Sequence, residues 1–269
     1  MRRSRGYDIM GCSEYQDGLL EQMAKTAGPS KVGIFDLDGC LFDTRHRQVM
    51  IMREYASRHD EPLLYHIHAA HFTDWDLKTP LRAVGMSETD VERLFKPLQK
   101  FWWPRFFSDT YVRMDHALPG AAQFVRQYHA QGAQVVYLTG RDHGMRAGTE
   151  ESLKACGFPY DIERTELITK AEFKQEDTEY KKEALDHIRQ LGEPVLFVDN
   201  EPSNVNAFKT ECPDALTVFI ETDHSPRPIE PKSTIPWIRS FCPRSWHGDN
   251  WKAAKSLPLT RLSEQSVRL

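Results

Sequence analysis

The stretch Lys31-Val-Gly-Ile-Phe-Asp-Leu-Asp-Gly-Cys-Leu-Phe-Asp-Thr44 holds the strongest structural signal in the chain, because an apolar run ends in two carboxylates and a glycine. The apolar residues Val32, Ile34 and Phe35 predict a short strand that is covered on both faces, as in a parallel sheet. Asp36 then falls at the carboxyl end of that strand, the edge where open α/β sheets bind ligands. Gly39 allows a sharp turn there. The stretch therefore predicts a first strand and one wall of a ligand site.

Asp36 and Asp38 stand one residue apart, and two ionised carboxylates so close together repel each other. The repulsion favours a divalent cation or a shared proton, and both arrangements suit phosphoryl transfer. One aspartate would attack phosphorus, while the other would protonate the leaving oxygen and later activate water. An acidic surface turn would contain the same residues, so this pair alone leaves both interpretations open.

Helix and strand patterns alternate after Pro119-Gly120. The expected strands cover 135–138, 166–169, 194–198 and 216–220, and the expected helices cover 121–130, 149–156, 178–191 and 203–209. Alternation at this interval predicts an α/β fold, a Rossmann-like doubly wound parallel sheet with right-handed crossovers.

This core is assigned to residues 31–44 and 116–222. Residues 45–115, which come between its two parts, lack strand alternation and carry helical spacing. Ser87 is placed to cap one of these helices, with Asp90 three residues further on. The intervening block is therefore expected to be a mainly α-helical cap domain.

The two ends of the chain carry weaker patterns. Residues 1–30 mix small, polar and charged types and are expected to form a loose or partly helical lead-in. Residues 223–269 contain many prolines, which predicts a tail that is packed on the surface or partly disordered. Three tryptophans suggest that part of the tail docks: Trp237, Trp246 and Trp251.

Composition narrows the class of protein. The chain has 269 residues, of which 40% are hydrophobic, enough for a substantial core. With 35 Lys and Arg against 39 Asp and Glu, its net charge of −4 gives no overall attraction to nucleic acid or anionic membrane, although a local basic patch stays open. Five cysteines without a Cys-x-x-Cys pair predict a reducing cytoplasm. No signal peptide or membrane span is evident, so we expect a soluble, unprocessed protein.

Two further strand ends carry residues that phosphate chemistry uses. Thr139 can donate its hydroxyl to a phosphate oxygen, and Gly140 leaves a neighbouring backbone N–H accessible. Arg141 is a candidate for contact with the phosphate or the leaving group. Asp199 and Asn200 follow another strand and offer oxygen ligands, which Mg²⁺ prefers. A magnesium and phosphate site is therefore expected at this edge of the sheet.

Lys181 is the candidate for the cation that a phosphate beside aspartates requires. With Leu185 and Ile188 it lies at helical spacing on an inward-facing stripe, where a surface lysine would be out of place. Lys182 would point away from that stripe, and Lys170 is a competing candidate. A lone lysine usually lies on a solvated helix face, so the assignment depends on the neighbouring strand ends.

These motifs resemble, in order, those of the haloacid dehalogenase (HAD) superfamily over about residues 31–220. They are Ile34-Phe-Asp-Leu-Asp-Gly39, Leu138-Thr-Gly-Arg141, the helix-borne Lys181 and Val198-Asp-Asn-Glu-Pro202. The resemblance implies that Asp36 is nucleophile and metal ligand, and that Asp38 is an acid/base whose carbonyl also binds Mg²⁺. It implies that Thr139 and Lys181 hold the phosphate. The helical block would be a cap of the family's first type, inserted after the first motif.

Two positions depart from the family pattern. Cys40 stands where Thr or Val is usual, and it should act as a small apolar residue. Asn200 stands where many members have a second Asp, and with Asp199 it resembles the Asp-Asn-x-Pro form of carboxyl-terminal-domain phosphatases. That form implies a weaker magnesium site with Asn as a ligand. Asp38 argues against dehalogenase activity, because true dehalogenases lack an acid there.

Two other clusters invite a functional interpretation. The spacing of His66, His68 and His71 places them on different faces of a helix, which favours packing or solvent contacts over a zinc site. The run Phe101-Trp-Trp-Pro-Arg-Phe-Phe107 could stack a planar substrate around Arg105. The interior of the cap and its seam with the core explain the run better.

The sequence thus predicts a Mg²⁺-dependent phosphatase that hydrolyses a small phosphate monoester through an aspartyl-phosphate intermediate. A cap closing over the site would exclude bulky polymers and favour small phosphorylated metabolites. A nucleotide or polynucleotide-end phosphatase is the alternative among enzymes. A degenerate fold kept for binding is the alternative from another class, with Asn200 as its first sign.

Overall fold

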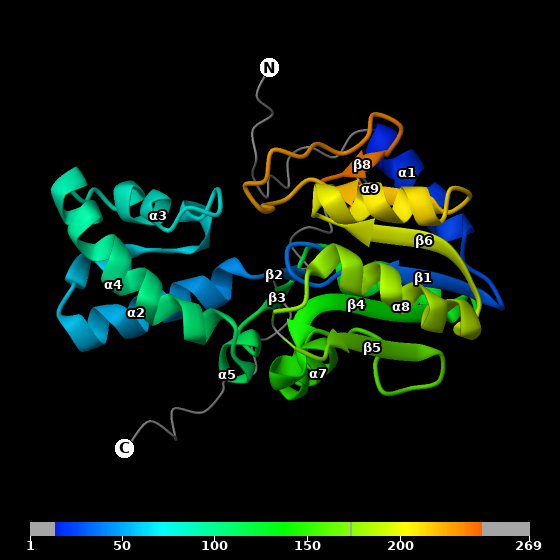
Figure 1. Ribbon diagram of the computed structural model, residues 1–269, viewed down its shortest axis with the longest axis horizontal. Coiled ribbons are helices and arrows are strands. Elements are labelled where there is room, and N and C mark those ends of the chain that lie inside the picture. Colours follow the sequence, from blue (N-terminus) through cyan, green and yellow to red (C-terminus); the bar gives the residue numbers. More distant parts are fainter. Residues whose placement is uncertain (1–13, 173, 244–269) are drawn as a thin grey trace, which may run out of the picture.

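The computed structural model describes residues 14–172 and 174–243, and its centre is a six-stranded parallel sheet (Figure 1). In spatial order the strands are β5 (Thr165–Lys170), β4 (Gln134–Asp142), β1 (Lys31–Phe35), β6 (Glu193–Asp199), β7 (Leu216–Ile220) and β8 (Trp237–Ile238). The chain builds outward from β1 on both sides, which places the topological switch point beside β1. The doubly wound α/β class predicted from the sequence is confirmed.

Helices cover both faces of the sheet. Successive side chains of a strand point to opposite faces, and the apolar side chains on each face pack against a layer of helices. One layer contains α1 (Glu14–Lys25), α6 (Ala121–Ala130) and α7 (Arg146–Ala155), which follows the short η4 (His143–Met145). The other contains α8 (Asp177–Leu191) and α9 (Pro202–Glu211). In β1, Phe35 packs with the first layer, whereas Val32 and Ile34 pack with the second. The strand is therefore buried on both faces, as its apolar sequence predicts.

Residues 45–112 form a series of helices beside the sheet (Figure 1). They are α2 (Arg45–His59), η2 (Pro62–His66), η3 (Ala69–His71), α3 (Lys78–Ala83), α4 (Glu88–Phe106) and α5 (Asp109–Val112). Their apolar side chains form a cluster of their own, distinct from the two clusters that flank the sheet. Helix α4 begins where the sequence predicts, since Ser87 Oγ accepts a hydrogen bond from the Asp90 N–H at 3.2 Å. We call residues 45–115 the helical block.

A two-stranded antiparallel ribbon joins the helical block to the sheet. Its strands are β2 (Phe42–Asp43), which precedes α2, and β3 (His116–Ala117), which follows α5. Gly39, between β1 and β2, has a φ of 75° and donates its N–H to Phe42 O at 2.9 Å. The left-handed turn brings both connections of the block to the carboxyl end of β1.

Strand β4 is longer than the sequence predicts. It continues beyond Leu138 to Asp142, because Asp142 pairs with Lys170 of β5 after a shift in register. Thr139 and Arg141 therefore lie within the strand rather than after it. The register shift lies close to the helical block, and it changes the direction in which these side chains point.

The segment after β7 is more than a surface tail. Strand β8 extends the sheet, with Trp237 opposite Phe219, and Gln16 of α1 donates to Cys242 O at 3.0 Å. The prolines were expected to prevent regular structure here. Pro236 is nevertheless compatible with β8, because it contributes only its carbonyl, which accepts the Phe219 N–H at 2.9 Å. Trp246 and Trp251 lie outside the described residues.

Within the described part of the chain, no helix combines the length and the apolar character needed to cross a bilayer. The cysteines in that part are free thiols. Cys40 is fully buried and donates its Sγ hydrogen to Val198 O at 3.4 Å. Burial raises the pKa of this thiol well above its usual value, so Cys40 stays neutral, as a small apolar residue would.

Candidate active site

The carboxyl ends of β1, β4 and β6 open into one cavity of about 500 Å³. Its walls come from these strand ends, from α8, from the helical block and from residues 223–227. Every residue that the sequence selects for the site lies on this cavity: Asp36, Asp38, Thr139, Gly140, Arg141, Lys181, Asp199 and Asn200. The parallel topology thus brings together residues that are far apart in sequence.

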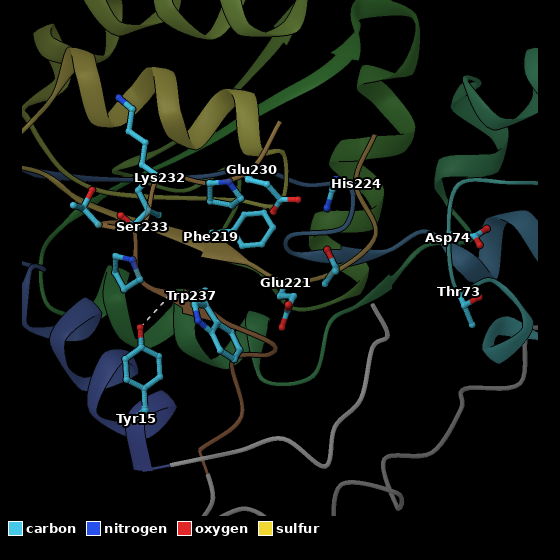
Figure 2. A pocket seen from close by; sticks show the side chains of 15 residues that line it. Tyr15, Thr73, Asp74, Phe219, Glu221, His224, Glu230, Lys232, Ser233 and Trp237 are labelled. Carbon is cyan, nitrogen blue, oxygen red and sulfur yellow. Dashed lines mark hydrogen bonds between the residues drawn. The ribbon is translucent and has the colours of Figure 1, made fainter. Parts of the chain in front are cut away.

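A larger cavity of about 1260 Å³ lies between the loop before α3 and the segment around β8 (Figure 2). Glu221, Glu230 and Lys232 are on its walls, but none of the residues selected from the sequence is. Its greater size does not make it the better candidate, because convergent ionisable groups identify a reactive site more specifically than volume does.

Lys181 connects two of the strand ends. Its Nζ donates to Asp36 Oδ1 at 2.6 Å and to Asp199 Oδ2 at 2.7 Å, and the lysine is only 5% exposed. Although burial works against a charged lysine, the two carboxylates raise its pKa above the usual value. Burial raises the pKa of Asp36 to about 8, against the opposing effect of Lys181 and with a further contribution from Asp199. The single positive charge of Lys181 therefore does not balance the negative charges of Asp36 and Asp199.

The other lysines have different partners. Lys182 lies on the outer side of α8 and pairs with Glu179 at 3.1 Å. Lys170 is buried and lines the cavity, but its Nζ pairs with Asp177 at 2.5 Å. Of the three lysines weighed from the sequence, Lys181 is the one in contact with Asp36.

The β6 end is held by a network around Asp199. Its Oδ1 accepts the Glu201 N–H at 2.7 Å, and its Oδ2 accepts Asn204 Nδ2 at 3.0 Å as well as Lys181. Asn200 Nδ2 donates to Asp223 O at 2.6 Å. These contacts fix both side chains at the cavity wall, and no hydrogen bond to Asn200 Oδ1 occurs among the described residues.

Thr139 and Gly140 bring β4 to the same wall. Thr139 is 1% exposed, and its Oγ1 accepts the Arg141 N–H at 3.2 Å. Gly140 lies against α8, where a Cβ would come within 2.8 Å of Asp177 Oδ2. A glycine at this position lets the first turn of α8, and with it Lys181, approach the strand.

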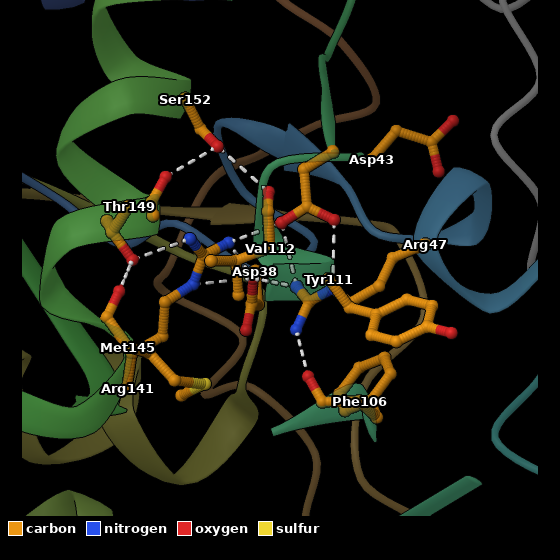
Figure 3. Close-up of polar contacts among 12 residues, drawn as sticks. Asp38, Asp43, Arg47, Phe106, Tyr111, Val112, Arg141, Met145, Thr149 and Ser152 are labelled. Atoms are coloured by element: carbon orange, nitrogen blue, oxygen red, sulfur yellow. Dashed lines mark hydrogen bonds and ion pairs between the residues drawn. The ribbon is translucent and has the colours of Figure 1, made fainter. Parts of the chain in front are cut away.

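Asp38 is held by two arginines (Figure 3). Its Oδ1 accepts Arg47 Nη2 at 2.9 Å and Arg141 Nη2 at 2.5 Å. Both guanidinium groups also bond Asp115. Burial works to raise the pKa of Asp38, but Arg141 and Arg47 together outweigh it and lower that pKa well below the usual range. Arg141, selected from the sequence for contact with phosphate or leaving group, has its guanidinium directed to carboxylates.

The helical block contributes aromatic side chains to the cavity. Trp75 and Trp103 are 49% and 51% exposed, and both lie on the cavity wall with Phe106 and Phe107. Arg105 instead pairs with Glu54 at 2.8 Å, inside the block. The aromatic run thus serves partly as the interior of the block and partly as a wall of the cavity.

The histidines do not share a helix face. His66 ends η2, and the rings of His68 and His71 lie against each other with centroids 3.6 Å apart. Within residues 14–172 and 174–243, no group of three or more His, Cys, Asp or Glu side chains is arranged to hold a metal ion.

The sequence reasoning missed Arg47, Asp115 and Asn204. Arg47 had a detectable signal, since it precedes the buried Ile51 by four residues and therefore lies on the inward side of α2. Asp115 had no such signal in the sequence, because its partners Arg47 and Arg141 are 68 and 26 residues away in the chain.

Solved structures with a similar fold include PtkA of Mycobacterium tuberculosis, at 18% identity over 78% of this chain and 93% of that chain, with a TM-score of 0.47. CbbY of Rhodobacter sphaeroides in complex with phosphate gives 15% identity, 79% and 95% coverage, and a TM-score of 0.45. A putative phosphatase from Clostridium difficile is 13% identical over 72% of this chain and 85% of that chain, with a TM-score of 0.47. These identities and TM-scores are low, so the three structures do not identify the activity of this chain.

Residues 95–216 match the family model described as HAD superfamily, subfamily IIIB (Acid phosphatase). The match starts within α4 and ends at β7, so it leaves out Asp36 and Asp38 and covers less than half of the chain. No curated protein matches the sequence. The matched segment carries Thr139, Lys181 and Asp199 on the cavity that also holds the β1 aspartates. Residues 95–216 are thus similar to the acid phosphatases of subfamily IIIB of the haloacid dehalogenase superfamily.

Proposed function

We propose that the protein is a Mg²⁺-dependent phosphatase that hydrolyses a small phosphate monoester through an aspartyl-phosphate intermediate. The observation that carries the proposal is the meeting of Asp36, Lys181 and Asp199 within hydrogen-bonding distance, in a cavity that also contains Thr139 and Asp38. A nucleophile, a cation, a hydroxyl donor and a second acid in one cavity meet the requirements of phosphoryl transfer.

Asp36 is the nucleophile in this proposal. Lys181 holds its Oδ1, while Oδ2 accepts no hydrogen bond from any described residue and can attack phosphorus. The backbone N–H of Asp36 donates to Val198 O at 3.0 Å, which fixes the residue at the junction of β1 and β6. Lys181 and Thr139 then offset charge on the phosphate oxygens as the Oδ2–P bond forms and the ester P–O bond breaks.

Asp38 transfers the protons. The negative charge of a bound phosphate would raise the lowered pKa of Asp38, so that Asp38 can carry a proton in the enzyme–substrate complex. In the first step it gives that proton to the ester oxygen of the departing alcohol, and in the second it takes a proton from the water that attacks the phosphorylated Asp36. Its position two residues after the nucleophile and on the same cavity supports this role. The reaction consumes one water and releases the alcohol and inorganic phosphate.

The donors at the cavity fit Mg²⁺. Two buried carboxylates share one lysine, and the raised pKa of Asp36 reflects the uncompensated negative charge. Mg²⁺ favours oxygen ligands and needs few from the protein, since it keeps waters and binds substrate phosphate. We propose that Asp36, Asp199, Asn200 and the Asp38 carbonyl hold it. The bound ion would supply positive charge to the phosphate oxygens.

The helical block would act as the cap in this proposal. It contacts the core through the β2–β3 ribbon and places Trp75 and Trp103 over the cavity that contains Asp36. A nucleotide or polynucleotide-end phosphatase remains the second candidate. These half-exposed indole rings favour it, because a nucleobase stacks on such surfaces, and Lys174 and Arg227 line the same cavity.

Release of phosphate from p-nitrophenyl phosphate tests the proposal. We expect turnover with Mg²⁺, its loss in excess EDTA and its recovery when Mg²⁺ is restored. Asp36→Asn removes the attacking oxygen and should abolish turnover. Activity that persists in EDTA, or in Asp36→Asn, would refute the proposed mechanism.

A further inference from the structure

Four charged side chains, Arg47, Asp115, Arg141 and Asp38, form a continuous network beside the cavity. Figure 3 labels Asp38 and the two arginines. Asp115 accepts Arg47 Nε on Oδ1 at 2.9 Å, and on Oδ2 it accepts Arg47 Nη2 at 2.8 Å and Arg141 Nη2 at 2.7 Å. Both arginines also donate hydrogen bonds to Asp38 Oδ1. Two positive and two negative charges therefore balance in a network of which three side chains are buried, and the desolvation of such groups requires this balance.

The network holds one oxygen of Asp38 and leaves the other accessible. Three N–H groups converge on Oδ1, whereas no described residue donates to Oδ2. The Asp38 side chain is 34% exposed, while those of Arg47, Arg141 and Asp115 are between 0% and 1% exposed. The buried members thus fix the rotation of the carboxylate and direct Oδ2 toward the cavity.

The network also spans the junction of the helical block with the sheet. Arg47 lies in the first turn of α2, and its Nη1 donates to Phe106 O at the end of α4 at 2.7 Å. Asp115 directly precedes β3, and Arg141 belongs to β4. Arg141 Nη1 donates to Thr149 Oγ1 of α7 at 3.0 Å. Asp38 is therefore held from both connections of the block and from the sheet.

We propose that Arg47, with Asp115 and Arg141, is a positioning residue that aims Oδ2 of Asp38 at the leaving oxygen and couples this aim to the placement of the helical block. The inference rests on the proposed function, because it assigns a partner to the proposed proton-transfer residue. A rotation of the block would move Arg47 with α2 and release Asp38 Oδ1 on one side. Proton transfer would then be efficient only with the block in the arrangement seen here.

The leaving group provides the test, because p-nitrophenolate departs without a proton, whereas an alkoxide needs one. Arg47→Met should reduce kcat for an alkyl phosphate on the order of 100-fold, the usual contribution of a placed acid or base, with KM little changed. With p-nitrophenyl phosphate, the first turnover should remain fast. Since Asp38 also activates water, the variant should give a burst of p-nitrophenolate followed by slow turnover.

Arg113→Met is the matched control. Arg113 also joins the end of the helical block to the core, through Glu151 of α7 at 2.7 Å, but it does not contact Asp38. This variant should keep the wild-type ratio of alkyl to aryl turnover and show no burst. If Arg47→Met does not fold, Arg47→Lys serves instead. A single ammonium cannot bond Asp38, Asp115 and Phe106 O with the guanidinium geometry, so the same loss of alkyl phosphate turnover and the same burst should appear to a smaller extent.

Equal losses on both substrates without a burst, or no loss at all, would overturn the inference. A selective alkyl loss in Arg113→Met as large as in the Arg47 variant would also overturn it. Failure of the proposed function is recognised separately, by a wild-type enzyme without Mg²⁺-dependent turnover or by an active Asp36→Asn. An inactive Asp36→Asn together with equal losses and no burst in Arg47→Met would overturn only the positioning role.

Discussion

Lys181 holds the carboxyl ends of β1 and β6 together through its bonds to Asp36 and Asp199. Each partner alone would be an uncompensated buried charge, and removing one member of such a group is usually strongly destabilising. The same ammonium faces the cavity in which we propose the phosphate binds. Structure and proposed chemistry therefore depend on one side chain, and a substitution should affect both.

Lys181→Met should lower kcat/KM with p-nitrophenyl phosphate on the order of 100-fold or more, because one preorganised donor to the developing charge is lost. The adjacent Lys182→Met is the control. Lys182 pairs with Glu179 and contacts neither Asp36 nor Asp199 among the described residues, so the activity of this variant should stay within twofold of wild type, with stability changed by less than about 0.5 kcal/mol. Steady-state kinetics and urea unfolding measure both, and similar activity of the two variants would contradict the assignment.

The pH dependence of stability should reveal the buried proton of Asp36. In metal-free protein its pKa is raised to about 8, above the value of ~3.9 expected when unfolded, so the folded chain binds more protons between these pH values. The free energy of unfolding should therefore fall as pH rises from about 4 to about 8. Asp36→Asn should reduce this fall by up to ~1.4 kcal/mol per pH unit. Urea unfolding in EDTA across this range measures it, and parallel curves for both proteins would contradict it.

Single residues differ in how far the sequence identifies them. Lys181 and Arg47 are both buried on their helices, each four residues before a buried apolar side chain, so helical spacing indicates Arg47 as it indicates Lys181. The partner of Asp38 could not be found in this way. Asp115 lies in a connection without periodicity, and only the folded chain brings it beside Arg47 and Arg141.

Among the elements, those with a clear period were predicted and those defined by pairing were not. Strands β1, β6 and β7 and helix α8 coincide with apolar runs or stripes in the sequence. The continuation of β4 to Asp142 depends on its shifted register with β5, and β8 contains only two residues that pair with β7. Neither feature leaves a local pattern, because cross-strand partners decide it.

The docking of the C-terminal segment on α6 can be tested at Gly120, where α6 begins. Gly120 has a φ of 81°, and a Cβ there would lie 2.4 Å from Phe241 O, a backbone atom. Gly120→Ala should therefore cost the left-handed penalty of about 1–2 kcal/mol and an additional penalty for displacing the segment. Gly85→Ala is the matched control, since Gly85 has a φ of 82° with nothing within 4 Å. Equal destabilisation in urea unfolding would show that the segment does not pack on α6 as described.

At the scale of the whole molecule, two bodies of apolar packing meet at a polar junction. The sheet and its helices build the floor of the cavity, while the helical block adds an aromatic wall through Trp75 and Trp103. Floor and wall serve different purposes in the proposed enzyme. The floor would carry the chemistry common to phosphate monoesters, and the wall would choose among the alcohols attached to the phosphate.

Trp75→Ala separates these contributions. Loss of an indole that stacks on a planar group should raise KM for p-nitrophenyl phosphate and for a nucleoside monophosphate about fivefold or more, a value near the lower limit for base–aromatic stacking. KM for an alkyl phosphate should change little, because it offers no planar surface. Tyr65→Ala is the control, since Tyr65 is also 49% exposed on the helical block but does not line the cavity. If Trp75→Ala changes KM equally for planar and alkyl substrates, the wall does not select for rings, and the nucleotide alternative loses the observation that favours it.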